Sequence, residues 1–307
     1  MNCLKLTTSV VLLLLLIFTA SSKADSGTFS EIYQAKKVVE LKTEVGSLEL
    51  KSWDRDEILV ECDYDMSGDL YIDPVIRERK NSLVIKGEIE GRRSNHYSSS
   101  VLWTITVPKG TEVEFNSTSG GVDIKDFDGT FSGSTASGSI ELRDCKGNYH
   151  FNTASGSIDI DNCDGEFKLN TASGRVRARE SKGIFKLTSA SGEVDINNVT
   201  LAGESEFTTA SGDAFVSLAQ ATEFDLEIAS ASGDATLDFN GNEISGFIQM
   251  SANDRRGNIR CPFDFDDVSY KKYKGSHNDQ VIKSVTVGKD NPYIAISTGS
   301  GRASLTK

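Results

Sequence analysis

The sequence predicts an all-β fold: a single-stranded parallel β-solenoid with about 18 residues per coil and irregular β caps at both ends. The first observation is a repeat: the tetrapeptide Thr/Ser-Ala-Ser-Gly occurs six times, after a related Ser-Thr-Ser-Gly segment. The second is that apolar and polar residues alternate after each glycine, which is the period of a strand and not of a helix. The third is length, because 18 residues are too few for a helical crossover between parallel strands. The repeat glycines are Gly120, Gly138, Gly156, Gly174, Gly192, Gly212 and Gly233.

Each repeat has the same order of strands and turns. Apolar residues stand two and four positions after the glycine, as Val122 and Ile124 do, and again seven, eleven and thirteen positions after it. Ser-Gly is expected to form one turn and a segment such as Asp144–Gly147 the other. Equivalent residues of successive coils should form columns that point into the core. They include an aromatic column, Phe131, Tyr149, Phe167 and Phe185, and an alanine column, Ala136, Ala154, Ala172, Ala190, Ala210 and Ala231.

The clear repeats occupy the middle of the chain. We expect residues 116–260 to form the repeat solenoid, residues 25–115 an N-terminal β cap with one degenerate coil at Gly46, and residues 261–307 a C-terminal closing β segment. Residues 25–307 should form one continuous domain, because no linker is found. Within the closing segment, Tyr293–Gly301 is similar to the repeat, with Ala303 and Leu305 in step. Atypical ends are expected, because an uncapped β edge promotes aggregation.

Residues 1–24 have the features of a secretory signal peptide. Lys5 precedes the apolar run Val10–Phe18, and Ser22-Lys23-Ala24 provides small residues for cleavage before Asp25. The run is too short to span a bilayer, and no second apolar segment follows. We therefore expect an exported protein, in the periplasm, at the cell surface or secreted, with no transmembrane segment in the mature chain. A net charge of −12 disfavours nucleic acid and anionic membrane as partners.

Four cysteines remain after removal of the signal peptide: Cys62, Cys145, Cys163 and Cys261. Cys145 and Cys163 occupy the same inward column in consecutive coils, where strands lie about 4.8 Å apart, which is within the range of a disulfide. Export permits that bridge, and the alternative is two stacked buried thiols in line with Ser181. Whether Cys62 and Cys261 pair is left open by the sequence.

The outward columns form the candidate binding face, a flat polar surface for a carbohydrate or protein partner. Within it, three arginines of one coil form a basic row between acidic rows. The alternative is cross-strand charge pairing that fixes the strand register, worth ~0.2–1 kcal/mol per pair. The members of this face are Asp159, Asp161, Arg175, Arg177, Arg179 and Asp195.

The sequence predicts no catalytic residue, no metal site and no cofactor. The serine of the tetrapeptide has six copies, and the histidines His96, His150 and His277 are scattered, so we expect these hydroxyls to bond the backbone between coils. Turn carboxylates offer calcium ligands, but lysine replaces the acid in alternate coils. A polysaccharide lyase or hydrolase is the enzyme alternative, with Asp159 and Asp161 as its acids, but no loop nearby is expected to form a groove.

The segments Leu102–Gly110 and Phe115–Ile124, the recurrent Ser-Gly-x-Val/Ile-x-Ile/Leu units and the closing Thr-Gly-Ser-Gly resemble the bacterial β-strand-repeat family labelled "putative adhesin". The similarity covers most of the mature chain, and that family supplies no established catalytic residues. The resemblance implies an adhesin-like interaction or structural module at the cell envelope, exported and non-enzymatic, with an unknown protein or carbohydrate as partner. The alternative is an envelope-stress or assembly factor that binds an envelope protein. The sequence does not give the oligomeric state.

Overall fold

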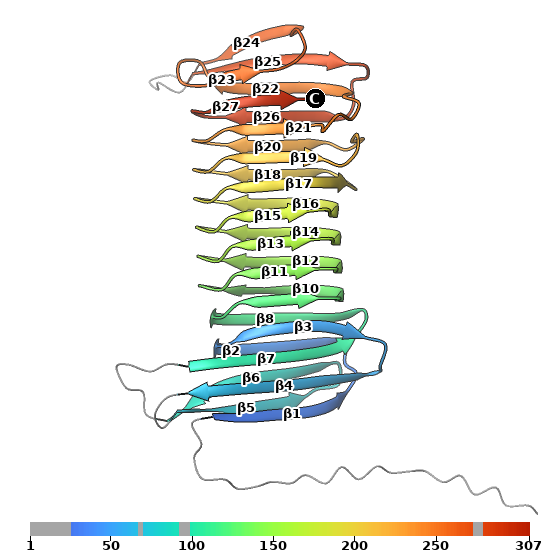
Figure 1. The fold of residues 1–307 in the computed structure, drawn as a ribbon, viewed down its shortest axis with the longest axis vertical. Coiled ribbons are helices and arrows are strands. Elements are labelled where there is room, and N and C mark those ends of the chain that lie inside the picture. The colour runs from blue at the N-terminus through green and yellow to red at the C-terminus, as the bar shows by residue number, and fades with distance from the viewer. Residues whose placement is uncertain (1–25, 67–69, 92–98, 273–278) are drawn as a thin grey trace, which may run out of the picture.

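The computed structural model describes residues 26–66, 70–91, 99–272 and 279–307. Within these ranges the chain forms strands β1 to β27 and no helix, and the strands wind into two sheets that enclose one core (Figure 1). The predicted signal peptide, residues 1–24, lies outside the described residues, as do His96 and His277. The predicted all-β solenoid is confirmed.

Sheet I and sheet II are named here by their strands in spatial order, from the N-terminal end of the molecule to the C-terminal end. Sheet I consists of β1 (Ser26–Gln34), β4 (Glu57–Met66), β7 (Ser99–Pro108), β3 (Ser47–Trp53), β9 (Val122–Lys125), β11 (Ile140–Arg143), β13 (Ile158–Asp161), β15 (Val176–Arg179), β17 (Val194–Leu201), β19 (Ala214–Leu218), β21 (Ala235–Asp238), β27 (Arg302–Thr306) and β23 (Asn258–Arg260).

Sheet II consists of β5 (Tyr71–Glu78), β6 (Ser82–Glu90), β2 (Val38–Val45), β8 (Thr111–Ser119), β10 (Asp128–Thr135), β12 (Lys146–Thr153), β14 (Asp164–Thr171), β16 (Lys182–Ser189), β18 (Ser205–Thr209), β20 (Leu226–Ser230), β26 (Tyr293–Thr298), β22 (Gly246–Asn253), β25 (Gln280–Val287) and β24 (Asp267–Lys271).

In the middle of the molecule, every strand pairs in parallel with the equivalent strands of the neighbouring coils. Tyr149 in β12 lies opposite Phe131 in β10 and Phe167 in β14. One strand of each sheet at the same level is called a rung below. Because the register is unbroken over several rungs, side chains at equivalent positions lie above one another and form continuous columns.

The predicted aromatic column is buried and stacked. The ring centroids of Tyr149 and Phe167 are 5.4 Å apart, and those of Phe167 and Phe185 are 5.3 Å apart. Phe131 is also buried, but its ring stacks on Phe151, at 5.6 Å, rather than on Tyr149. Burial of these large rings makes the aromatic column a main part of the core.

The prediction that the alanine column points into the core is wrong, because its residues are exposed at the turn. The threonine or serine before each alanine is buried instead. Thr153, for example, donates its hydroxyl to the Gly138 carbonyl oxygen at 3.0 Å and accepts from the Gly156 amide at 3.1 Å. With its hydroxyl bonded to two backbone groups, a polar side chain takes the inward position at low cost.

The prediction that the serines of the tetrapeptide bond the backbone between coils is also wrong. These serines are exposed, and the threonine or serine hydroxyl two positions earlier makes those bonds. Their glycine is also fixed by the stacking: a side-chain carbon at Gly156 would clash with the Gly138 carbonyl oxygen of the rung below. The exposed serines are Ser137, Ser155, Ser173, Ser191, Ser211 and Ser232.

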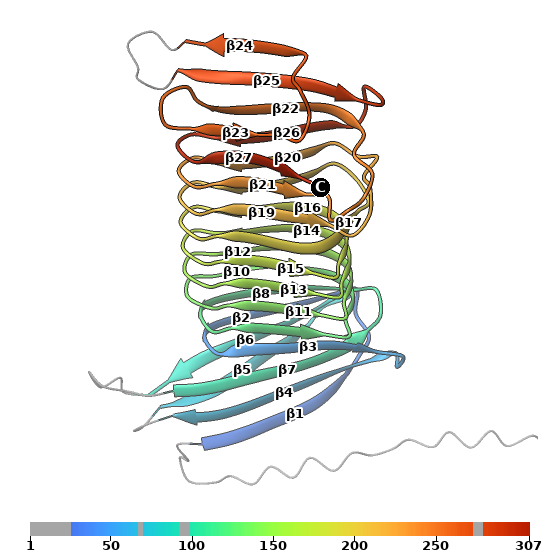
Figure 2. The same ribbon diagram turned by 45° about the horizontal axis from the view of Figure 1, so that its top comes forward.

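At both ends the order of the rungs differs from the order of the chain (Figure 2). The rung of β2 and β3 lies between the rung of β6 and β7 and the rung of β8 and β9. The rung of β26 and β27 lies between that of β20 and β21 and that of β22 and β23. Outside these rungs, antiparallel pairs close the molecule: β4 with β1 and β7, β5 with β6, and β25 with β22 and β24.

Candidate interaction face

The outward face of sheet I carries a ladder of ion pairs. Arg177 in β15 lies one rung above Asp159 in β13 and one rung below Asp195 in β17, with nitrogen–oxygen distances of 3.1 and 3.6 Å. Arg143 in β11 bonds Asp123 of the rung below, at 2.9 Å. Because parallel strands are in register, Arg177 reaches carboxylates of its own column on both neighbouring rungs, whereas Arg143 reaches diagonally from the column of Lys125 to that of Asp123.

Hydrogen bonding fixes part of this ladder. Arg143 also contacts Glu141 of its own strand at 2.9 Å, and the hydrogen bond that Arg143 donates to the Asp123 carboxylate raises the pKa of the guanidinium. The Nε atoms of Arg143 and Arg177 are buried and without a hydrogen-bond partner in the described residues. The Nη atoms of both arginines make the shorter ion pairs, and Nε of Arg177 lies 3.6 Å from the Asp195 carboxylate, beyond hydrogen-bond distance.

The structure brings all six residues of the predicted binding face onto sheet I and its adjoining turn, but in two different states. Asp159, Arg177 and Asp195 belong to the ladder, and Arg175 pairs with Glu193 at 2.9 Å. Asp161 and Arg179 lie opposite one another in register, and both are exposed. Neither of these two takes part in an ion pair within the part of the chain that the structure describes.

The outward side chains of sheet I leave shallow grooves between them. One, of about 250 Å³, contains the exposed pair and the ladder together. Its lining residues are Glu141, Leu142, Asp159, Ile160, Asp161, Arg177 and Arg179. This groove needs no protruding loop, because the outward side chains of the sheet form its walls.

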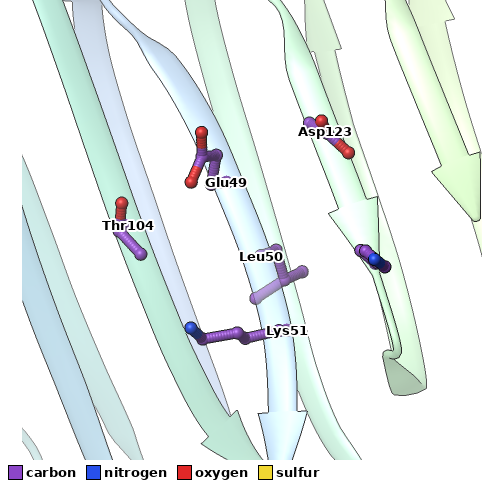
Figure 3. A pocket seen from close by; sticks show the side chains of 6 residues that line it. Glu49, Leu50, Lys51, Thr104 and Asp123 are labelled. Carbon is purple, nitrogen blue, oxygen red and sulfur yellow. The ribbon is translucent and has the colours of Figure 1, made fainter.

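A second groove, of about 280 Å³, lies on the same face where β3 enters the stack. Figure 3 shows Glu49 and Lys51 on β3, between Thr104 on β7 and Asp123 on β9. Sequence reasoning did not include Glu49 and Lys51 in the site. The signal was present, because they stand three and five positions after Gly46, as Asp123 and Lys125 do after Gly120.

The second candidate pair, Cys145 and Cys163, is buried at consecutive turns on the side of the molecule where sheet I passes into sheet II. Both are free thiols in the structure; Sγ of Cys145 lies 3.1 Å from the Arg143 carbonyl oxygen, and Sγ of Cys163 lies 3.2 Å from that of Asp161. A hydrogen bond between the two thiols, together with burial, raises the pKa of Cys163. The two sulfur atoms are thus neighbours in one column.

The other two cysteines do not form a pair. Cys62 is in β4 in the N-terminal cap, and Cys261 follows β23 in the C-terminal cap, at the opposite end of the molecule (Figure 1). Both are free thiols. Burial raises the pKa of Cys62 to about 12.

Two further properties concern the described residues as a whole. No group of three or more His, Cys, Asp or Glu side chains among them is placed to hold a metal ion. None of them forms a helix long and apolar enough to cross a membrane.

Solved structures that match this chain include a putative adhesin from Parabacteroides distasonis ATCC 8503, at 12% identity and a TM-score of 0.39, over 92% of this chain and 97% of that one. They also include a putative adhesin from Parabacteroides merdae ATCC 43184, at 11% identity and a TM-score of 0.33, over 92% and 96%. A putative cell adhesion protein from Clostridium sporogenes ATCC 15579 matches at 13% identity and a TM-score of 0.26, over 92% and 99%. No curated protein matches the chain.

The repeat units and the stacked rungs agree with one family of sequences. The model of the Toastrack DUF4097 family matches residues 37–257, which is more than half of the chain. The chain therefore belongs to the Toastrack DUF4097 family.

Proposed function

We propose that this chain is an exported, non-enzymatic binding module that presents the outward face of sheet I to a partner at the cell envelope, in the manner of an adhesin. The observation that carries the proposal is the groove beside β13 and β15. There the ladder of Asp159, Arg177 and Asp195 holds a charged surface in place, while Asp161 and Arg179 stay open to solvent.

Order within the face favours binding, because side chains that are already fixed lose little conformational entropy when a ligand docks. Arg177 contacts carboxylates on both neighbouring rungs, and its side chain is only 25% exposed. Arg179, by contrast, is exposed and can form new bonds to carboxylate, phosphate or hydroxyl groups. The face thus combines a rigid base with two available charged groups.

The regular spacing of the face favours an extended partner. Equivalent positions recur at each rung, about 4.8 Å apart, so that a polysaccharide or an extended protein segment meets a series of similar sites. The grooves at β3 and β9 and at β13 and β15 lie on this same face. Contacts spread over several rungs allow useful affinity although each exposed charge pair contributes little.

The test compares two exposed charge reversals on opposite faces. Arg179→Glu changes the proposed face, and Lys186→Glu makes the same charge change on the outward face of sheet II. Binding of residues 25–307 to separated polysaccharide and protein fractions of a cell envelope is measured, with the melting temperature of each variant. We expect Arg179→Glu to weaken binding roughly tenfold or more at an unchanged melting temperature, and Lys186→Glu to leave it unchanged.

The fraction that is bound identifies the partner as polysaccharide or protein. The proposal fails if neither fraction binds, or if both variants weaken binding equally. Release of new reducing ends from the polysaccharide fraction would also contradict it, because that would indicate a glycan-cleaving enzyme.

A further inference from the structure

Each sheet has an edge strand at each end of the molecule: β1 and β23 for sheet I, β5 and β24 for sheet II. An edge strand presents unpaired N–H and C=O groups that can pair with another chain, and proteins usually prevent this. Three of these edges have such a protective feature. β5 contains Pro74, β23 has only 3 residues, and β1 directs the charged Glu31 toward the inner face, opposite the buried Val60.

The fourth edge, β24, has none of these three features. It extends beyond the last complete rung, because sheet I ends at β23 while sheet II continues through β25 to β24 (Figure 2). All five of its residues are exposed, with Val268 47% and Tyr270 65% accessible. Among the described residues, β25 is the strand that pairs with β24, and none pairs with its other side, so the backbone edge of β24 is open at the C-terminal end of the molecule.

The two apolar side chains of β24 lie on the inner face of sheet II. Val268 is opposite Lys283 and Tyr270 is opposite Val281. Those two residues of β25 are in turn opposite Met250 and Ala252 of β22, both buried in the core. Side chains on this face are covered by sheet I elsewhere in the molecule. At β24, an apolar pair on the inner face is left open next to a free edge.

The sequence of β24 is complementary to itself. In an antiparallel pair of two β24 strands centred on Ser269, Asp267 of each strand lies opposite Lys271 of the other, on the outward face. On the inner face, Val268 of each strand lies opposite Tyr270 of the other. Pairs of opposite charge and aromatic–β-branched pairs are among the cross-strand pairs that stabilise a sheet.

We propose that β24 pairs with β24 of a second copy of this chain, which gives a two-fold symmetric dimer with a continuous sheet II. Only the antiparallel register centred on Ser269 forms both charge pairs. A parallel pair would place Asp267 beside Asp267 and Lys271 beside Lys271, and like charges directly opposite are destabilising. The strand is thus suited to one arrangement, and the two-fold axis makes the contact closed, so that it stops at two copies.

The other edges are less suitable occupants of this site. Pro74 removes a donor from β5, the 3 residues of β23 offer a short ladder, and pairing with β1 would bring Glu31 next to the apolar pair of β24. Of the four edge strands, β24 itself has the charges and apolar residues that match those of β24. Because the contact involves only five residues of each copy, we expect a weak dimer whose population depends on concentration.

Charge exchange tests the register. Asp267→Lys and Lys271→Asp each replace both symmetric ion pairs with like charges, whereas the double variant restores both pairs in the reversed sense. Sedimentation equilibrium of residues 25–307 measures the dimerisation constant, and the melting temperature reports on folding. We expect each single variant to weaken the dimer about tenfold or more, and the double variant to return close to the original constant. Asp164→Lys makes the same charge change on the exposed face of β14 and should have no effect.

Cross-linking tests the position of the axis. In the proposed dimer Ser269 faces Ser269 of the second copy, at a Cα separation of about 4.5–5.5 Å that suits a disulfide. With oxidised glutathione as oxidant, the Ser269→Cys variant should form a disulfide-linked dimer, while Ser251→Cys on β22 should not. The proposal is overturned if the chain is a monomer at every concentration and Ser269→Cys does not cross-link. It is also overturned if the single charge variants dimerise as the original chain does.

Discussion

Tyr149 combines two roles at the scale of one residue. Its ring stacks on Phe167, and its hydroxyl lies 3.2 Å from the carbonyl oxygens of Phe127 and Lys146, to which it donates. Burial, followed by the nearby Cys145, raises the pKa of Tyr149 above the usual range of a tyrosine. The folded chain therefore holds this proton at a pH at which an unfolded chain releases it.

Tyr149→Phe should separate the two roles. At neutral pH we expect the loss of one hydrogen bond, about 0.5–1.5 kcal/mol of unfolding free energy, while the ring stack remains. Above about pH 10 the unfolded tyrosine ionises and the folded one does not, so the unfolding free energy of the original chain falls as pH rises. The variant should lose less stability over this range. Urea unfolding of both chains at neutral and alkaline pH measures the difference.

Cys62 provides the background for this comparison. Its pKa of about 12 is above that of an unfolded thiol, so the unfolding free energy of both chains also falls as pH rises above the ordinary pKa of a thiol. An equal loss of stability in the original chain and the Tyr149→Phe variant would show that Tyr149 ionises alike in the folded and unfolded states.

Cys145 and Cys163 should form an intramolecular disulfide when oxidised glutathione is present. The two thiols are reduced in the structure, and one turn of the exchange would release two molecules of reduced glutathione for each bridge formed. Because both thiols are buried and out of reach of the oxidant, we expect slow oxidation at neutral pH and faster oxidation at alkaline pH, where more thiolate forms. Intact mass after blocking of free thiols measures the extent.

Cys163→Ser is the matched control, because the next residue of the column, Ser181, already places a hydroxyl there and bonds the Cys163 amide at 3.0 Å. This variant should fold and should lose the bridge. Retention of a bridge in Cys163→Ser, or two reactive thiols at 145 and 163 after prolonged exposure to the oxidant, would contradict the pairing.

At the scale of one element, the turn between β14 and β15 depends on a buried hydroxyl. Thr171 donates to the Gly156 carbonyl oxygen at 2.8 Å and accepts from the Gly174 amide at 3.0 Å. Thr171→Val keeps the shape but leaves both backbone groups unpaired in the core, so we expect a loss of about 1–3 kcal/mol of unfolding free energy. Ser173→Ala, two residues away and exposed, should change it by less than about 0.5 kcal/mol. Denaturant unfolding compares them; equal effects would contradict the assignment.

This turn also shows where sequence reasoning succeeded and failed. Val176 and Ala178 are buried as the alternation after Gly174 predicts, because a strand holds its period of two. Ala172 was assigned to the core and Thr171 was given no place there, because hydropathy alone favours alanine over threonine as the buried residue. The alternation does not extend through a turn, and the bonding of the Thr171 hydroxyl to two backbone groups is visible only in the structure.

The candidate face was predictable to a similar degree. The period placed Asp159, Arg177 and Asp195 in one outward column, and the structure shows them as one ladder. The sequence could not distinguish these from Arg179, which is exposed and outside the ladder, because both columns have the same spacing.

At the scale of the whole molecule, both ends contain a rung that comes from a distant part of the chain. In the middle, side-chain bonds between rungs join residues 18 apart, as in Asn170 to Asn152. At the ends they join residues 74 apart, as in Gly121 to Ser47, or 68 apart, as in Tyr293 to Asp225. The repeat glycine spacing gives the form of a rung but not its place in the stack. The insertion of the Gly46 coil and of the Tyr293 segment was therefore not readable from the sequence.

The last prediction concerns the inserted C-terminal rung, which consists of β26 and β27. β26 and β27 have a partner strand on each side, and they bury Ile294, Ile296, Ala303 and Leu305. Removal of residues 292–307 would uncover the edges of β20 and β21 and also detach the rung of β22 and β23. Loss of the two isoleucines and the leucine from the core alone amounts to about 5–9 kcal/mol at about 1.5–3 kcal/mol each.

We therefore expect the chain truncated after Asn291 to expose its C-terminal third and to aggregate, whereas removal of residues 26–34, a single edge strand with one partner, should be tolerated better. Hydrogen exchange gives the same comparison without truncation, because the amides of Ile294 and Ile296 should exchange far more slowly than those of the edge strand β24. If residues 292–307 simply capped the end in chain order, their loss would shorten the molecule by one rung and leave β22 and β23 protected. Protected β22 amides in the truncated chain would thus contradict the inserted rung, since β22 lies beyond β26 from the rest of sheet II.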